Sequence, residues 1–136
     1  MSESRAHLDL VLKAVSYIKE IVPEEYQGLI YFDSPDTVRP PKIENNYVPD
    51  VYYCYKDLLI IGEAKTYEDF ERNHSKLQYQ AYLKETIKFN GSSIIVVSVP
   101  WQIVPTAKNL LRRFKNNTNS TAKIIVINEL GSCFEI

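Results

Sequence analysis

The stretch YVPDVYYCYKDLLIIGEAKT, residues 47–66, has the pattern of a β-hairpin with charged side chains in its core. If Lys56 and Asp57 form a two-residue turn, Tyr55 pairs with Leu58 and the rest of the register follows by counting away from the turn. Side chains alternate between the two faces of an extended strand. The count and the alternation together predict which of the charged residues share a face.

Three charged residues of this hairpin are expected to lie together. Counting back from the turn places Asp50 opposite Glu63, and Lys65 follows Glu63 on the same face of its strand. Opposed carboxylates destabilise a sheet unless something neutralises them, and a divalent cation such as Mg²⁺ does so with oxygen ligands. An alternative is that Asp50 only ends a turn, while Glu63 and Lys65 pair in an exposed ladder that binds nothing. The apolar neighbours of the carboxylates favour the metal site.

The rest of the sequence predicts helices and strands on either side of the hairpin. Apolar residues recur with a period near 3.6 in residues 3–22, which is typical of an amphipathic helix that ends before Pro23. The other expected elements are strands at 28–33, 92–99 and 122–129 and helices at 67–89 and 105–116. The order α-β-β-β-α-β-α-β implies a mixed central sheet, antiparallel at the hairpin and parallel at the helical crossovers, with helices on both faces.

Size and composition predict a single domain that spans residues 1–136, which the order of its elements makes an α/β domain. With 45% apolar residues, the chain is long enough for one core and too short for two. The formal net charge of −1 indicates neither a general nucleic-acid binder nor a membrane-surface protein, so any basic surface must be local. Cys54 and Cys133 lack the spacing of a zinc or iron–sulfur site. No membrane segment is evident, and we expect a cytoplasmic protein.

Two motifs in these elements resemble a known family. Pro49-Asp50 followed by Gly62-Glu63-Ala64-Lys65 is similar to the signature of the PD-(D/E)xK, or restriction-endonuclease-like, nuclease superfamily. Gln78 and Tyr82, four residues apart in the predicted helix at 67–89, resemble the QxxxY motif of its branch found in recombination helicase–nuclease complexes. The resemblance covers roughly residues 3–129 and implies that family's αβββαβ core, here followed by a further helix and strand.

The resemblance implies a metal-dependent DNA nuclease. Asp50, Glu63 and the Ala64 backbone carbonyl would hold Mg²⁺, with Mn²⁺ as a substitute, and Lys65 would orient the nucleophilic water or stabilise the transition state. Gln78 and Tyr82 would support the nucleophile, the lysine or a DNA phosphate.

A further metal ligand is expected from the first helix, because many members of the family contribute a glutamate there. Glu3 lies at the edge of the buried stripe of that helix and is the preferred candidate over Glu20, which follows the polar side. The alternative for Glu3 is a solvated residue that stabilises the helix dipole.

DNA contacts are expected from local basic patches: Arg39 and Lys42 before the hairpin, and Lys108, Arg112 and Lys115 along the helix at 105–116. A solvated helix face is the alternative for that stripe.

A small nuclease that cuts both strands is expected to form a homodimer. Two other functions stay open: a non-catalytic nucleic-acid-binding or assembly module with the same fold, and a resolvase of branched DNA such as Holliday junctions.

Overall fold

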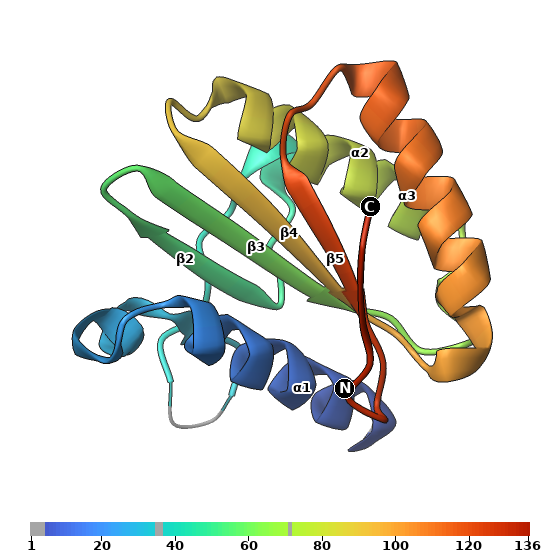
Figure 1. The fold of residues 1–136 in the computed structure, drawn as a ribbon, viewed down its shortest axis with the longest axis horizontal. Coiled ribbons are helices and arrows are strands. Elements are labelled where there is room, and N and C mark those ends of the chain that lie inside the picture. Colours follow the sequence, from blue (N-terminus) through green and yellow to red (C-terminus); the bar gives the residue numbers. More distant parts are fainter. Residues whose placement is uncertain (1–4, 35–36, 71) are drawn as a thin grey trace.

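The computed structural model describes residues 5–34, 37–70 and 72–136, and it has the predicted α/β fold (Figure 1). One mixed sheet has six strands in the order β1-β2-β3-β4-β5-β6; β3, β4 and β5 are parallel and the other neighbours are antiparallel. The strands are β1 (Tyr31–Phe32), β2 (Val51–Tyr55), β3 (Leu58–Ala64), β4 (Ser92–Ser98), β5 (Lys123–Ile127) and β6 (Cys133–Glu135). The helices are α1 (Arg5–Ile21), α2 (Asn73–Lys88) and α3 (Val104–Thr118), with short 3₁₀ helices at Glu24–Leu29, Glu44–Asn46 and Trp101–Ile103.

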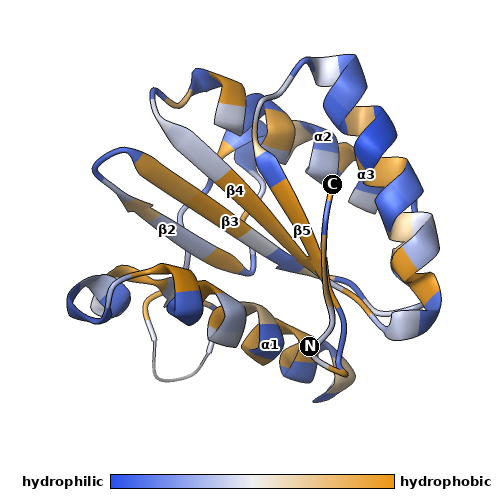
Figure 2. Cartoon of the chain, viewed as in Figure 1, coloured by the Kyte–Doolittle hydropathy of each residue, from blue (hydrophilic) through white to orange (hydrophobic). Residues whose placement is uncertain are grey.

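Helices cover both faces of the sheet, as the element order predicts. Figure 1 shows α1 on one side and α2 with α3 on the other, and Figure 2 shows β3, β4 and β5 as hydrophobic over most of their length. Alternation along β3 sends Ile60 and Ala64 into the core under α1, and Leu59 and Ile61 into the core under α2 and α3. Both faces of this strand are therefore buried, which is typical of a parallel strand between helical layers.

The hairpin register is confirmed. Tyr55 pairs with Leu58 across the turn, and the ladder continues to the pair of Val51 with Gly62. Lys56, the first residue of the turn, has a φ of 53°, in the left-handed region that two-residue hairpin turns require. The next position after this ladder is that of Asp50 opposite Glu63, so the strand count brings the two carboxylates to the same end of the hairpin.

Two expected element boundaries were wrong, and one strand was missed. The strand predicted at 28–33 is reduced to Tyr31–Phe32, because the Gln27 side chain donates to the carbonyls of Lys19 and Val22 at the end of α1 and draws the chain into a 3₁₀ helix. The helix predicted from residue 67 begins only at Asn73, after a turn. A sixth strand, β6, was not predicted, and three residues are too few for a clear alternation pattern.

Gly62 allows α1 to pack closely on the hairpin. A Cβ atom at this position would lie 2.9 Å from the Val51 Cβ and 3.4 Å from the Ile18 Cδ1. We expect Gly62→Ala to lower the free energy of unfolding by about 1–3 kcal/mol, because a well-packed core accepts an added methyl group only by shifting its neighbours. Urea denaturation measures the loss. Gly28→Ala is the control, since no atom of the described residues lies within 4 Å of the added Cβ; equal stability of the two variants would contradict the close packing.

Among the helices in the described part of the chain, none has the length and apolar character needed to cross a membrane.

Candidate functional site

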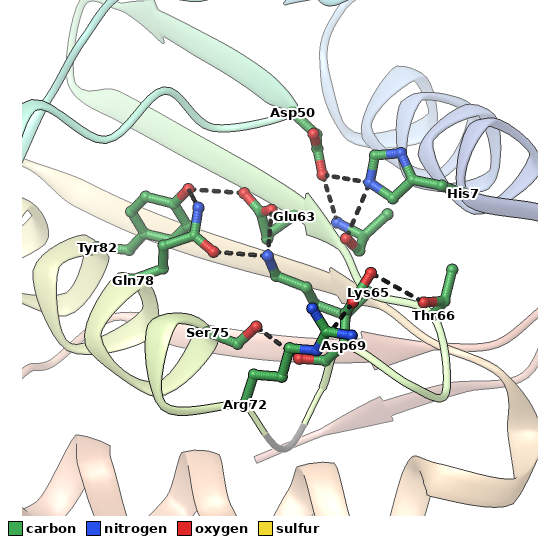
Figure 3. Close-up of polar contacts among 11 residues, drawn as sticks. His7, Asp50, Glu63, Lys65, Thr66, Asp69, Arg72, Ser75, Gln78 and Tyr82 are labelled. Carbon is green, nitrogen blue, oxygen red and sulfur yellow. Dashed lines mark hydrogen bonds and ion pairs between the residues drawn. The ribbon is translucent and has the colours of Figure 1, made fainter. Parts of the chain in front are cut away.

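The residues predicted to carry chemistry meet at the carboxyl end of β3 (Figure 3). Glu63 and Lys65 come from the end of this strand, and Asp50 directly precedes β2, its antiparallel neighbour. Gln78 and Tyr82 reach the same place from α2, where their four-residue spacing puts both on the buried face toward the sheet. The carboxyl ends of parallel strands, where the chain turns away into crossover helices, are a common place for binding sites in α/β folds.

Asp50 is held by hydrogen bonds at the edge of α1. Its Oδ2 accepts a hydrogen bond of 2.9 Å from the backbone N–H of Ala64 and lies 3.3 Å from the Nε2 of His7. The same Nε2 lies 3.1 Å from the Ala64 carbonyl oxygen. Because a carbonyl oxygen only accepts, Nε2 is the donor in this contact. The imidazole thus bridges two of the oxygen atoms that were expected to bind the metal.

Glu63 and Lys65 form a second, continuous chain of contacts with α2. The Tyr82 hydroxyl donates to Glu63 Oε1 at 2.7 Å, and the Lys65 Nζ lies 3.4 Å from Glu63 Oε2. Lys65 also donates to Gln78 Oε1 at 2.6 Å, and the Gln78 amide lies 3.4 Å from the Tyr82 hydroxyl. These four side chains form a closed ring of contacts, which restricts the Lys65 ammonium group to one position.

Burial and neighbouring charges separate the pKa values of the two carboxyl groups. Burial raises the pKa of Glu63 to about 8, and the negative charge of Asp50 adds to this rise, while Lys65 opposes it. Burial would also raise the pKa of Asp50, but the hydrogen bonds from His7 and the Ala64 N–H outweigh it and leave this pKa below its usual value. Asp50 is therefore ionised at neutral pH while Glu63 retains a proton in much of the population.

The oxygen atoms at this site fit a hard divalent cation. Two carboxylates and one backbone carbonyl suit Mg²⁺, which typically takes one or two carboxylates and completes its shell with water and phosphate oxygens. Within residues 5–34, 37–70 and 72–136, no three His, Cys, Asp or Glu side chains are arranged as a metal site. The expected ligand Glu3 lies outside the described residues.

The Tyr79 hydroxyl is a buried donor beside this site. It has no hydrogen-bond partner in the described part of the chain. Burial raises the pKa of Tyr79 well above its usual value, and the charges of Glu63 and Asp50 add to the rise. The negative charges of the two carboxylates therefore favour the protonated form of the Tyr79 hydroxyl, which makes no hydrogen bond to the described residues.

The predicted DNA-contacting residues have different surroundings. Arg39 is exposed, and its Nε lies 3.8 Å from Asp33 Oδ1. The backbone N–H of Asp33 donates to the Asp50 carbonyl, so the partner of this arginine is hydrogen-bonded to a residue of the site. Lys42 is exposed on the segment before β2. Two of the three basic residues of the α3 stripe already contact the C-terminal segment. The Lys108 Nζ lies 4.8 Å from the centre of the Phe134 ring, and the Lys115 Nζ donates to the Ile136 carbonyl at 3.5 Å. Arg112 remains exposed.

His7 is the site residue that sequence reasoning missed. The signal was its spacing, since His7 precedes the buried residues Leu10 and Val11 by three and four positions and so lies over the buried stripe of α1. A single histidine on an amphipathic helix says nothing of which strand end it will face. No protein-family model, curated protein or solved structure matches the chain.

Proposed function

We propose that this protein is a metal-dependent nuclease that hydrolyses DNA phosphodiester bonds, with the PD-(D/E)xK arrangement of active-site residues. One observation carries the proposal: Asp50, Glu63 and Lys65 converge at one strand end, and the helix pair Gln78 and Tyr82 contacts two of them directly. An ordinary exposed ion-pair ladder does not account for this arrangement, because the Glu63 side chain is only 4% exposed and that of Lys65 only 12%.

Asp50, Glu63 and the Ala64 carbonyl are the ligands we assign to Mg²⁺, with Mn²⁺ as a substitute. When bound, the cation would supply a water molecule of lowered pKa and positive charge near the phosphoryl oxygens. Its positive charge would also favour the ionised form of Glu63, whose proton is retained by burial and by the charge of Asp50. His7 already bridges Asp50 and the Ala64 carbonyl, and it orients both oxygen donors from α1.

Lys65 is the residue that we expect to act on the reacting groups. Its ammonium donates one hydrogen bond to Gln78 and lies beside Glu63, and an ammonium group has three N–H donors. A remaining N–H can orient the attacking water or donate to a phosphoryl oxygen as negative charge develops there. Tyr82 fixes the carboxylate of Glu63, and Gln78 fixes Lys65, so both act as positioning residues.

Incubation of the purified protein with linear, supercoiled, single-stranded and branched DNA tests the proposal. We expect cleavage of at least one substrate with Mg²⁺ or Mn²⁺ and none with EDTA. Asp50→Ala should remove this cleavage, because it removes one of the two carboxylates assigned to the metal, whose Oδ2 is held by the Ala64 N–H. Cleavage that persists in EDTA, or at the wild-type rate in Asp50→Ala, would contradict the metal mechanism. Binding of DNA without cleavage of any substrate would instead favour a non-catalytic module.

A further inference from the structure

Two adjoining hollows lie on the outer surface of α3, beyond the site at the end of β3. The first, of about 550 Å³, lies between α3, the Trp101–Ile103 segment and β6, and Trp101 and Phe134 are among its walls. The second, of about 370 Å³, lies between α3 and α2 and includes Lys76 and Arg113. Asn109 of α3 lines both hollows, so they adjoin along the helix surface.

The charge of these hollows is wholly positive. Their described lining residues include four cationic side chains and no carboxylate: Lys76, Lys108, Arg112 and Arg113. A third hollow, of about 790 Å³, lies on the other side of the Pro100–Gln102 segment and has the opposite character. Its described lining contains four carboxylates and no lysine or arginine: Asp9, Glu68, Asp69 and Glu129. A polyanion that leaves the site is therefore repelled on the α1 side and attracted on the α3 side.

The first hollow offers aromatic surface to a flat ligand. Trp101 is 54% exposed, and its backbone N–H donates to Glu129 Oε1 at 2.8 Å, which fixes the start of this segment. Phe134 lies in the same hollow beneath the Lys108 ammonium. An exposed indole beside cations is the combination that binds single-stranded nucleic acids, because bases stack on rings while phosphates pair with lysine and arginine. In a duplex the bases are already stacked and paired, so they cannot enter such a hollow.

The hollow lies close to the proposed catalytic groups along the chain. The Ser98 carbonyl accepts a hydrogen bond of 3.1 Å from the Lys65 N–H, and Trp101 follows Ser98 by three residues. Three residues of extended chain span at most about 11 Å, so the indole belongs to the same end of the sheet as Lys65.

We propose that the hollows along α3 bind an unpaired nucleic-acid strand, with a base stacked on Trp101 and its phosphates along Arg112, Arg113 and Lys76. This inference deepens the proposed function and rests on it for the chemical class of the substrate. The strand runs from the site at Lys65 over the Trp101 segment onto α3. The protein accordingly selects substrates that carry an unpaired segment next to the phosphodiester bond that is cut.

Intrinsic fluorescence tests the proposal directly, because Trp101 is the only tryptophan among the 136 residues. The full chain is titrated in EDTA, which prevents cleavage, with an oligothymidylate, with the matching RNA strand, with an abasic strand of equal length and with a blunt duplex. We expect quenching of Trp101 by an unpaired strand that carries bases and little quenching by the abasic strand or the duplex. Equal quenching by the abasic strand or the duplex, or no quenching at all, would overturn the base-stacking site.

Variants separate base stacking from phosphate binding. By anisotropy of a labelled oligothymidylate, Trp101→Ala should weaken binding at least about fivefold, the lower limit for loss of one stacked base. Arg112→Ala with Arg113→Ala should weaken binding and flatten the dependence of log K on log salt concentration by about 0.7 for each phosphate that the variant no longer neutralises. The matched control is Lys13→Ala with Lys19→Ala, which removes the same charge from exposed positions on α1, across the sheet. A control variant that binds as weakly as the α3 variant would overturn the assigned path.

The outcome is independent of the nuclease assay. Quenching without cleavage of any DNA would remove the proposed catalytic function and leave the strand-binding surface in place. Cleavage without quenching would leave the nuclease in place and remove this surface as its substrate path.

Discussion

Lys65→Ala should lower the rate of Mg²⁺-dependent DNA cleavage by about 10²- to 10⁴-fold, the range for loss of a positioned proton-transfer or charge-stabilising group. The structure gives the reason: the ammonium is held between Gln78 Oε1 and Glu63 Oε2, and the backbone N–H of the same residue is bound to Ser98. Lys65→Arg should not restore activity, because a planar guanidinium is larger and cannot place a donor where the compact ammonium lies. Single-turnover cleavage with saturating metal measures both variants.

A graded comparison shows whether the effect comes from the ammonium itself. Gln78→Ala removes one hydrogen bond that positions Lys65 but keeps the charge, so its rate should fall between those of the wild type and Lys65→Ala. Lys84→Ala is the matched control, because it removes an exposed lysine from the same region, on α2. Wild-type cleavage by Lys65→Ala, or an equal loss in Lys84→Ala, would remove Lys65 from the mechanism.

Stability of the metal-free protein should fall by up to about 3 kcal/mol as the pH rises from about 5 to about 8. The carboxyl group of Glu63 has a pKa near 4.5 in the unfolded chain and about 8 in the folded one. Between these two values the folded state holds the proton more tightly, so the unfolded state is favoured progressively with rising pH. The stabilising effect is complete below about pH 4.5 and is lost as the pH passes through 8. Urea denaturation at a series of pH values measures this slope.

Mg²⁺ should restore part of this lost stability, and more of it at pH 8 than at pH 6. A carboxylate binds a metal only when ionised, so binding must displace the proton of Glu63, which costs more free energy at lower pH. Thermal unfolding with and without Mg²⁺ at the two pH values measures the difference. Glu63→Gln should flatten the pH dependence and abolish the difference. The same slope in this variant would assign the titration to another group, and an undiminished Mg²⁺ effect would place the cation elsewhere.

Much of the fold follows from local patterns in the sequence. The hairpin register could be counted from Lys56-Asp57 because pairing in a hairpin is fixed by the turn and by the alternation of buried side chains. The helices α1 and α3 were expected from their apolar period and β4 from its run of apolar, β-branched residues, and all three lie close to their predicted positions. The helix α2 was expected too, but it begins later than predicted. Of the two short strands, β1 is shorter than the strand expected at 28–33, and β6, which pairs with β5, was not expected.

The candidate site was predictable where one element, or two strands joined by a tight turn, carries several of its residues. Glu63 lies in β3 and Lys65 directly follows that strand, while Gln78 and Tyr82 share α2, so strand and helix periods predict each pair. His7 comes from α1, far from the hairpin in sequence, and periodicity says nothing about its distance from Asp50. The helix period also predicted the stripe of basic residues on α3, but it did not predict what they contact. Lys108 and Lys115 reach the C-terminal segment, whose path no periodic pattern indicates.

By itself, the sequence determined the α/β class, the register of the hairpin and therefore the placement of Asp50 at the same strand end as Glu63 and Lys65. Each of these depends on residues near one another in the chain, where backbone geometry converts spacing into position. Only the tertiary structure decided that His7 bridges Asp50 and the Ala64 carbonyl, that Glu63 is buried enough for a pKa of about 8, and that the described lining of the hollows along α3 carries cations and no carboxylate. Those properties arise from the packing of separate elements, because burial and electrostatic environment depend on every group that surrounds a residue.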